Sequence, residues 1–246
     1  MAHHPSGSLP TPPPDDASSA LDEEHLYIVI PAYNEGTRLG KVLEQLIPMR
    51  ANIVVVDDGS SDNTAEIAAA YPVHVLRHVI NRGQGAALQT GITYSLRQGA
   101  EYLVTYDADG QHQHTDIARM LTPVKEQQCD VALGSRFLDD RSNVPLARRC
   151  LLQAARTFTR WTSGLNLTDC HNGFRVLSRR AAAAIQIRQD GMAHASEIYD
   201  QIVTRHLAYR EVPVQIHYSA DTLEKGQSGS NAIRIAFHYL MGKLAT

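Results

Sequence analysis

The sequence of 246 residues is poor in three features that would each point to a class of protein. It has three cysteines, Cys129, Cys150 and Cys170, an odd number without metal-ligand spacing, which fits a reducing compartment better than a disulfide framework. It has no excess of positive charge, since 23 Lys and Arg stand against 26 Asp and Glu, so we expect no nucleic-acid partner. No apolar run approaches the roughly 20 residues that span a bilayer, and the amino end lacks a signal-peptide pattern. We therefore expect a cytoplasmic protein.

Composition divides the chain into three parts. Residues 1–24 are rich in Pro, Ser, Asp and Ala without apolar periodicity, which predicts a disordered tail. Residues 25–223 have the composition of one globular domain. Residues 224–246 contain a polar loop and an amphipathic helix, which either packs on the domain or makes peripheral contact with the inner face of a membrane. The apolar positions on one face of that helix are Ile233, Phe237 and Leu240.

Strands and helices are expected to alternate in the first half of the domain. Short, apolar, β-branched runs predict strands at residues 26–30, 53–56, 73–76 and 102–106. Helical spacing of apolar residues predicts helices at residues 39–47, 65–69 and 86–97. This alternation predicts an α/β fold, Rossmann-like, with a mostly parallel central sheet flanked by helices. In such sheets ligands bind beyond the carboxyl ends of the strands.

Two adjacent carboxylates, Asp57 and Asp58, follow the second predicted strand. Further along the same loop, Asp62 or Thr64 could cap the next helix. Capping by either residue leaves the adjacent pair unexplained. We therefore expect Asp57 and Asp58 to face a ligand.

Gly83 and Gly85 open the third predicted helix. They either permit a tight turn or let backbone N–H groups approach a phosphate. The sequence leaves both alternatives open.

The most informative stretch lies at the end of the fourth predicted strand. Residues i and i+2 of an extended segment point the same way, so Asp107 and Asp109 can converge on one divalent cation, with Gln111 next in the series. Oxygen ligands suit Mg²⁺ or Mn²⁺. The alternative is a solvated acidic turn. His112 and His114 are interpreted as polar residues of an exposed loop, with His112 the better candidate for a group behind the ligands.

Four segments, in this order, resemble the signatures of family 2 glycosyltransferases of the GT-A fold. They are Pro-Ala-Tyr-Asn-Glu at 31–35, Val-Val-Val-Asp-Asp-Gly-Ser-Ser-Asp at 54–62, Arg-Gly-Gln-Gly at 82–85 and Asp-Ala-Asp-Gly-Gln at 107–111. The resemblance covers most of the ordered chain, and the most similar branch contains the dolichyl- and polyprenyl-phosphate sugar synthases. It continues through Asp-x-x-x-Gly-Phe-Arg at 169–175 and an acidic residue that opens a helix, Glu197.

The resemblance implies a nucleotide-sugar donor, GDP- or UDP-linked. Pro31, Tyr33 and Glu35 would contact the nucleoside, and Asp57 or Asp58 would accept hydrogen bonds from a base or ribose edge. The predicted cation would bridge the donor phosphates and stabilise the charge that grows on the leaving diphosphate.

Arg136, Arg148 and Arg175 are candidates for binding phosphate, because guanidinium offers a planar fork of donors. In the polyprenyl-phosphate branch, arginines near the positions of Arg136 and Arg148 hold the acceptor phosphate. Arg149 beside Arg148 makes the second match ambiguous, and a solvated helix residue is the alternative there.

The resemblance also implies inversion at the anomeric carbon. An alcohol acceptor would need a general base, for which Asp169 and Glu197 are the candidates, whereas an acceptor phosphate is already anionic and needs none. Asp169 could instead be structural, and Glu197 could simply stabilise a helix amino end.

The sequence therefore predicts a metal-dependent hexosyltransferase that moves a sugar to a polyprenyl phosphate, or alternatively to a saccharide in glycan synthesis. A haloacid-dehalogenase-type phosphatase would carry its Asp-x-Asp motif after the first strand and continue with Thr or Val, not with Gln111. A sugar nucleotidyltransferase would have a glycine-rich, basic entry after the first strand. A non-catalytic relative is disfavoured because both carboxylates of the predicted metal site are present.

Overall fold

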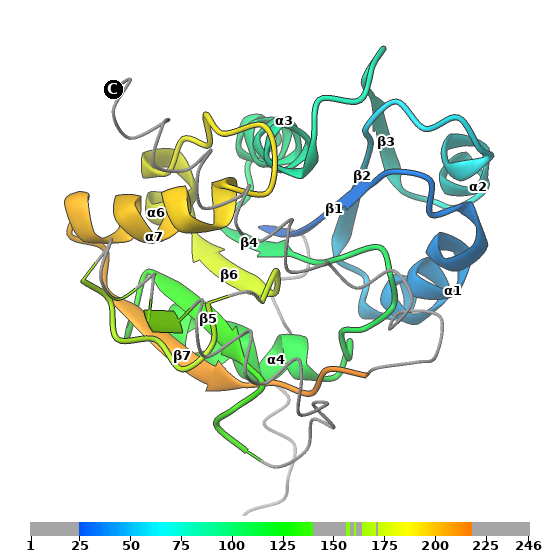
Figure 1. Ribbon diagram of the computed structural model, residues 1–246. Helices are drawn as coiled ribbons and strands as arrows, with labels where there is room; N and C mark the ends of the chain where they lie inside the picture. The colour runs from blue at the N-terminus through cyan, green and yellow to red at the C-terminus, as the bar shows by residue number, and fades with distance from the viewer. Residues whose placement is uncertain (1–24, 140–155, 158–159, 161–163, 171, 218–246) are drawn as a thin grey trace, which may run out of the picture.

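The computed structural model describes residues 25–139, 156–157, 160, 164–170 and 172–217 (Figure 1). The predicted amino-terminal tail, Arg148 and the predicted carboxyl-terminal helix lie outside the described residues. Within them, one seven-stranded sheet has the strand order β3-β2-β1-β4-β6-β5-β7. The strands are β1 (Leu26–Ala32), β2 (Asn52–Asp57), β3 (His74–Arg77), β4 (Tyr102–Thr105), β5 (Val131–Ser135), β6 (Arg175–Ser178) and β7 (Tyr209–Pro213).

The first four strands are all parallel, as the alternation of strands and helices predicts. β6 runs antiparallel to both of its neighbours, β4 and β5, and β5 pairs with β7 in parallel. The sheet is therefore mixed but mostly parallel.

β1 continues through Pro31 to Ala32 instead of closing at the proline. Pro31 lacks an N–H, but β4 pairs with β1 only as far as Val29, so that side of residue 31 has no strand neighbour that needs the donor.

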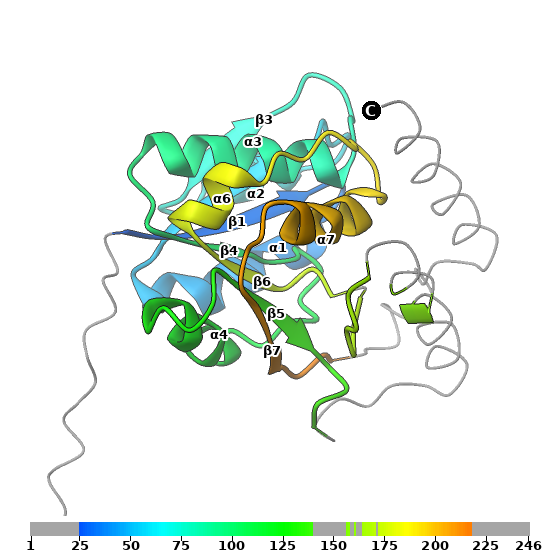
Figure 2. The same cartoon turned by 90° about the vertical axis from the view of Figure 1, so that its left-hand side faces the viewer.

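Helices cover both faces of the sheet (Figures 1 and 2). The helices are α1 (Gly36–Leu46), α2 (Thr64–Ala69), α3 (Gln84–Arg97), α4 (Asp116–Lys125), α6 (Arg179–Ala184) and α7 (His194–Thr204), and α1 runs on into a short 3₁₀ helix, η2 (Ile47–Met49). Alternate residues of β1 face opposite cores: Ile28 and Ile30 pack with α1, α2 and α4, whereas Tyr27 and Val29 pack with α3, α6 and α7. Since both faces are buried, the strands read as continuous apolar runs.

The carboxyl ends of β1, β2 and β4 lie at the same edge, because these strands are parallel neighbours. The polar loops that follow them therefore meet at this edge of the sheet. The fold confirms the predicted α/β class and brings the three sequence motifs together.

Substituting Gly91 with Ala should destabilise the fold by about 1–3 kcal/mol, because α3 presses directly on the sheet there. A methyl group at Gly91 would lie 2.3 Å from Val29 Cγ1 and 3.2 Å from Val56 Cγ2. This clash should outweigh the helix-propensity gain of about 1 kcal/mol. Urea unfolding measures the difference.

Gly40→Ala is the matched control, because it makes the same change inside α1 and its methyl group would meet only side-chain ends, the Tyr71 hydroxyl at 3.3 Å and Ile67 Cγ2 at an ordinary contact distance of 3.7 Å. We expect it to be neutral or stabilising. Equal effects of the two substitutions would contradict the close packing of α3.

Candidate active site

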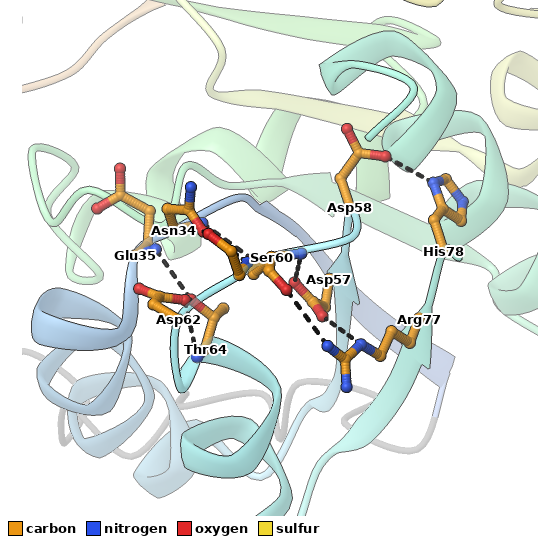
Figure 3. Close-up of polar contacts among 10 residues, drawn as sticks. Asn34, Glu35, Asp57, Asp58, Ser60, Asp62, Thr64, Arg77 and His78 are labelled. Atoms are coloured by element: carbon orange, nitrogen blue, oxygen red, sulfur yellow. Dashed lines mark hydrogen bonds and ion pairs between the residues drawn. The ribbon is translucent and has the colours of Figure 1, made fainter. Parts of the chain in front are cut away.

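The loops after β1 and β2 are joined to each other by side-chain hydrogen bonds (Figure 3). Asn34, at a positive φ of 54°, accepts a hydrogen bond at Oδ1 from Ser61 N at 2.9 Å, and its own N–H donates to Ser60 Oγ at 2.9 Å. The two motifs therefore form one rigid unit although 26 positions separate Asn34 from Ser60 in the sequence.

Asp62 serves the amino ends of two helices at once. Its Oδ1 accepts from Thr64 N, the first residue of α2, at 3.0 Å, and its Oδ2 accepts from Gly36 N, the first residue of α1, at 3.1 Å. Its partial desolvation raises its pKa, but these hydrogen bonds and that of the Thr64 hydroxyl hold the pKa below its ordinary value. Of the two predicted capping residues, Asp62 therefore bonds to the helix amino ends, although Asn63 occupies the N-cap position of α2, and the Thr64 hydroxyl accepts from Glu35 N.

The side chains predicted to contact the nucleoside differ in exposure. Pro31 is buried inside β1, whereas Tyr33 is 47% exposed at the edge of the sheet. The Glu35 carboxylate pairs with Arg38 at 2.9 Å. Tyr33 is therefore the one of the three whose side chain is largely open to a ligand.

Asp57 and Asp58 are both buried, and their carboxylates turn to different partners (Figure 3). Asp57 Oδ1 accepts from Ser60 N at 3.1 Å, and Oδ2 lies 3.1 Å from Arg77 Nε. Arg77 also lines a pocket of about 240 Å³ together with Gly59, Ser60, His78 and Val79. Asp57 therefore stands behind the wall of a cavity at the carboxyl ends of β2 and β3.

Asp58 fixes the loop that leads into α3. Its Oδ1 receives hydrogen bonds from His78 Nδ1 at 2.7 Å and Arg82 N at 3.0 Å, and its Oδ2 accepts from Gly83 N at 2.6 Å. His78 Nε2 is held in turn by Thr90 Oγ1 at 3.0 Å. Asp58 therefore has hydrogen-bond partners different from those of Asp57, and these partners hold the loop in place.

Gly83 and Gly85 allow another segment to approach closely. A methyl group at Gly83 would lie 2.4 Å from Asp190 O, and one at Gly85 would lie 2.0 Å from Gln189 O. Their N–H groups donate to Asp58 Oδ2 and to Asp190 O. In this structure these donors serve protein acceptors, and Gly83 has a positive φ of 111°, so a turn at Gly83 and the close approach of residues 189–190 both account for the glycines.

Asp107 and Asp109 occupy the loop after β4, as the sequence predicts. Asp107 accepts from Gln84 Nε2 at 3.1 Å and from His112 Nε2 at 2.9 Å, one bond to each oxygen. Asp109 Oδ1 accepts from the backbone N–H of Gln111 at 3.0 Å. The Gln84 side chain therefore connects the amino end of α3 to this acidic loop.

The two carboxylates repel each other. Burial raises the pKa of Asp109, and the charge of Asp107 raises it further. Burial also acts to raise the pKa of Asp107, but the hydrogen bond and charge of His112 and the charge of Arg175 bring it below its ordinary value. A divalent cation beside this pair would relieve the repulsion, and its oxygen donors suit Mg²⁺ or Mn²⁺.

No group of three or more His, Cys, Asp or Glu side chains within the described ranges is arranged to hold a metal ion. The predicted set does not need one, because it consists of two carboxylates and the amide of Gln111. Mg²⁺ commonly takes one or two carboxylates and completes its shell with waters and substrate phosphates. The residues present therefore fit such a cation.

The prediction that His112 lies in an exposed loop is wrong. It is 3% exposed, with its ring 5.2 Å from that of Tyr106 and 5.1 Å from that of Phe174. The loop folds back because the Tyr106 hydroxyl donates to His112 O at 2.7 Å. His112 thereby stands behind Asp107, which is the alternative that the sequence analysis named for His112 rather than for His114.

The two candidate general bases both have protein partners. Asp169 Oδ2 accepts from Arg136 Nε at 2.6 Å and from Arg136 N at 3.2 Å, and both side chains are buried. The Glu197 carboxylate accepts from the backbone N–H groups of Arg188 and Gln189 at 2.9–3.1 Å. The Arg136 contacts agree with the structural alternative for Asp169, whereas Glu197 binds the backbone of residues 188–189, a contact that the sequence analysis did not consider.

Arg175, the first residue of β6, is only 2% exposed, and its Nε and Nη1 have no hydrogen-bond acceptor in the part of the chain that the structure describes. Its guanidinium carbon lies 5.8 Å from the ring centre of Tyr199. Burial, together with the Arg175 charge, lowers the pKa of nearby His194 to about 4, so that imidazole is neutral at pH 7. A buried guanidinium with two unsatisfied donors is a candidate binder of an anion.

Three contacts at this edge could not be predicted from the sequence: the Gln84–Asp107 hydrogen bond, the His78–Asp58 hydrogen bond and the Arg77–Asp57 ion pair. Gln84 does stand between the two motif glycines, which is the one sequence feature that could have drawn attention to it.

Comparison with known proteins identifies the family of the chain. The model of the family "Glycosyl transferase family 2" matches residues 27–185. The chain is 30% identical to polyprenol monophosphomannose synthase of Mycolicibacterium smegmatis, covering 88% of this chain and 86% of that protein. It is 29% identical to UDP-N-acetylglucosamine–dolichyl-phosphate N-acetylglucosaminyltransferase of Methanococcus voltae, covering 91% and 98%.

The fold is shared with a solved glycosyltransferase. Glucosyl-3-phosphoglycerate synthase of Mycobacterium tuberculosis, crystallised with Mn²⁺, UDP and phosphoglyceric acid, superposes with a TM-score of 0.72 over 99% of this chain and 84% of that one, at 15% identity. The family that the sequence motifs indicate is therefore confirmed: the chain belongs to glycosyl transferase family 2 and has the GT-A fold.

Proposed function

We propose that the protein transfers a hexose from a GDP- or UDP-sugar to a polyprenyl phosphate, with inversion and with Mg²⁺ or Mn²⁺ at Asp107 and Asp109. The observation that carries the proposal is the pair of mutually repelling carboxylates at the end of β4, of which Asp107 is held by Gln84 and His112 and Asp109 by Gln111 N. A cation held there with Gln111 would neutralise the charge that develops on the leaving diphosphate.

The donor nucleoside belongs beside the loops after β1 and β2. Tyr33 offers an exposed aromatic ring there for stacking. The cavity lined by Ser60 and Arg77 offers polar groups to a base or ribose edge, with Asp57 buried behind them. The structural neighbour with UDP supports a nucleotide donor. This arrangement does not distinguish GDP from UDP.

The acceptor is inferred from the hydrogen-bond partners of the two candidate bases. Asp169 is committed to Arg136, and Glu197 directs both oxygens to backbone N–H groups. An alcohol acceptor would need one of them as a base, whereas an acceptor phosphate attacks as an anion without one. The names of the two curated relatives, which act on polyprenol and dolichyl phosphate, support the same acceptor.

Arginines supply the positive charge for the phosphates. Arg136 is held by Asp169, so its guanidinium is fixed in place. Arg175, close to the predicted metal-site carboxylates, has two N–H donors that no described residue accepts. We assign Arg175 as the buried phosphate-binding group, with Arg148 and Arg136 as further candidates.

A polyprenyl phosphate places the reaction at a membrane surface, so peripheral contact at the inner face is part of the proposal. No helix in the described part of the chain is long and apolar enough to cross a bilayer.

The test is a transfer assay with a panel of GDP- and UDP-sugars, with and without undecaprenyl or dolichyl phosphate, in Mg²⁺ or Mn²⁺ and with a chelator control. We expect chelator-sensitive formation of a lipid-linked sugar. Donor turnover that yields a glycosylated saccharide and no lipid product would contradict the proposed acceptor.

Asp109→Asn should lower transfer about a hundredfold or more, because it weakens the binding of the cation that stabilises the leaving group. The fold should be retained. The raised pKa of Asp109 means that its ionised form weakens the folded state. Its contribution to stability is present below the unfolded pKa and is lost as pH rises through the folded pKa.

In metal-free buffer the Asn variant should therefore match the wild type at low pH and be the more stable protein at neutral pH, as thermal unfolding measures. Saturating Mn²⁺ should raise the wild-type Tm and leave the variant unchanged. Full turnover in the variant would refute the metal assignment.

Arg175→Lys should lower transfer about tenfold to a hundredfold, because the ammonium group keeps the charge but loses the planar fork. The KM of the phosphate-bearing substrate should rise. Initial rates with donor and acceptor varied separately distinguish donor diphosphate from acceptor phosphate. Arg119→Lys, on the exposed face of α4, is the matched control. Unchanged KM values for both substrates in Arg175→Lys would remove Arg175 from the site.

A further inference from the structure

The segment 186–191 joins α6 to α7 and runs beside the amino end of α3 (Figures 1 and 2). We call it the strap. It belongs to no helix or strand, yet four consecutive backbone N–H groups are each accepted by a side chain of α3 or α7. Gln186 N donates to Gln201 Oε1 at 2.8 Å, Ile187 N to Gln89 Oε1 at 2.6 Å, and Arg188 N and Gln189 N to Glu197 at 2.9–3.1 Å.

Glu197 and Gln201 stand four residues apart on α7, so they project from the same helix face. Glu197 accepts more of the hydrogen bonds from the strap than Gln201 does. One oxygen, Oε2, accepts from both Arg188 N at 3.0 Å and Gln189 N at 2.9 Å, while Oε1 lies 3.1 Å from Arg188 N. Both carboxylate oxygens of Glu197 therefore serve as hydrogen-bond acceptors for the backbone of the strap.

The other side of the strap holds the first turn of α3. Asp190 O accepts from Gly85 N at 2.8 Å and from Ala86 N at 3.2 Å, which satisfies two N–H groups that a helix amino end leaves free. The Asp190 carboxylate pairs with Arg82 at 3.1 Å. The absence of side chains at Gly83 and Gly85 permits this contact.

The first turn of α3 reaches the acidic loop through one residue. Gln84, the first residue of the helix, donates from Nε2 to Asp107 Oδ1. A continuous set of contacts therefore runs from Glu197 through the strap and the α3 amino end to Asp107.

We propose that Glu197 is a positioning residue for the transfer reaction: its carboxylate holds the strap, and the strap seats α3 so that Gln84 orients Asp107. The inference rests on the proposed function for its effect on turnover. Its structural half, that Glu197 holds the strap, is independent of any substrate.

Two substitutions at Glu197 separate this role from that of a general base. In Glu197→Gln the amide oxygen can occupy the Oε2 position and still accept from both N–H groups, but it cannot take a proton. Glu197→Ala removes the acceptor altogether. A positioning residue predicts that Gln restores most of what Ala loses, whereas a general base predicts that both variants lose about 10²–10⁴-fold.

Limited trypsin digestion without substrate measures how often the strap opens. Arg188 is exposed, and cleavage after it gives a fragment that begins at Gln189. When reclosing is fast, cleavage follows the population of the opened segment. We expect cleavage at this bond to be about tenfold faster in Glu197→Ala and within about threefold of wild type in Glu197→Gln. Glu66→Gln, which removes the same charge from the exposed face of α2, should cleave as the wild type does.

Transfer rates should follow the same order, with kcat about tenfold lower in Glu197→Ala, nearly restored in Glu197→Gln, and with an unchanged pH profile in both. Gly85→Ala provides a second route if Glu197→Ala does not fold, because its methyl group would displace the strap while Glu197 remains. It should accelerate cleavage and lower transfer in the same way.

Wild-type cleavage rates in Glu197→Ala and Gly85→Ala would overturn the proposal. So would faster cleavage with unchanged transfer, or an equal loss of transfer in the Gln and Ala variants with the strap still protected. Failure of the proposed function has a different signature, since full activity of Asp109→Asn would leave the digestion result standing.

Discussion

The site is governed by the need to compensate negative charge buried at one edge of the sheet. A buried carboxylate destabilises the fold unless it is paired and hydrogen-bonded. Three carboxylate residues at this edge of the sheet are at most 2% exposed: Asp57, Asp58 and Asp169. Each has dedicated partners, namely Arg77 with Ser60 N, His78 with the 82–83 backbone, and Arg136. Asp109, which is partly buried, differs from these three: among the described residues only Gln111 N donates a hydrogen bond to it, and its near neighbour Asp107 repels it. Strain of this kind is tolerated where function needs it.

These partners also explain how loops from distant parts of the sequence become one rigid site. The Asp58 carboxylate holds Arg82 N and Gly83 N, and from there the chain enters α3, whose first side chain reaches Asp107. Glycine at position 85 brings the strap within hydrogen-bonding distance of the same helix end. The geometry of the acidic loop after β4 thus depends on residues that follow β2 and precede α7.

The sequence predicts this fold to the extent that local patterns report burial. Continuous apolar runs mark β1, β2 and β4 because helices cover both faces, and the polar stretches mark where those strands end. The antiparallel placement of β6 between β4 and β5 has no such signal, since strand periodicity is the same in either direction. The prediction for His112 is wrong for a similar reason. Polar neighbours in the sequence predict an exposed side chain, but the rings of Tyr106 and Phe174 pack against the imidazole. The motif residues were therefore predictable, while the pairing of Arg136 with Asp169, 33 positions apart, was not.

The same compensation bears on which reaction the site can support. A phosphate acceptor must approach a donor diphosphate, so two anions have to meet in one small volume, and uncompensated carboxylates there would oppose both. The buried Asp58 and Asp169 carry no such penalty, because hydrogen-bond donors and a guanidinium already surround them. Arg175, two of whose donors have no acceptor among the described residues, and a cation at the Asp107–Asp109 pair would together make this edge of the sheet attractive to anions. A saccharide acceptor would require the opposite arrangement, a carboxylate open to a hydroxyl proton. The described residues that were candidates for this role, Asp169 and Glu197, instead accept hydrogen bonds from Arg136 and from the backbone of residues 188–189. The electrostatics of the site therefore favour an acceptor that brings its own charge.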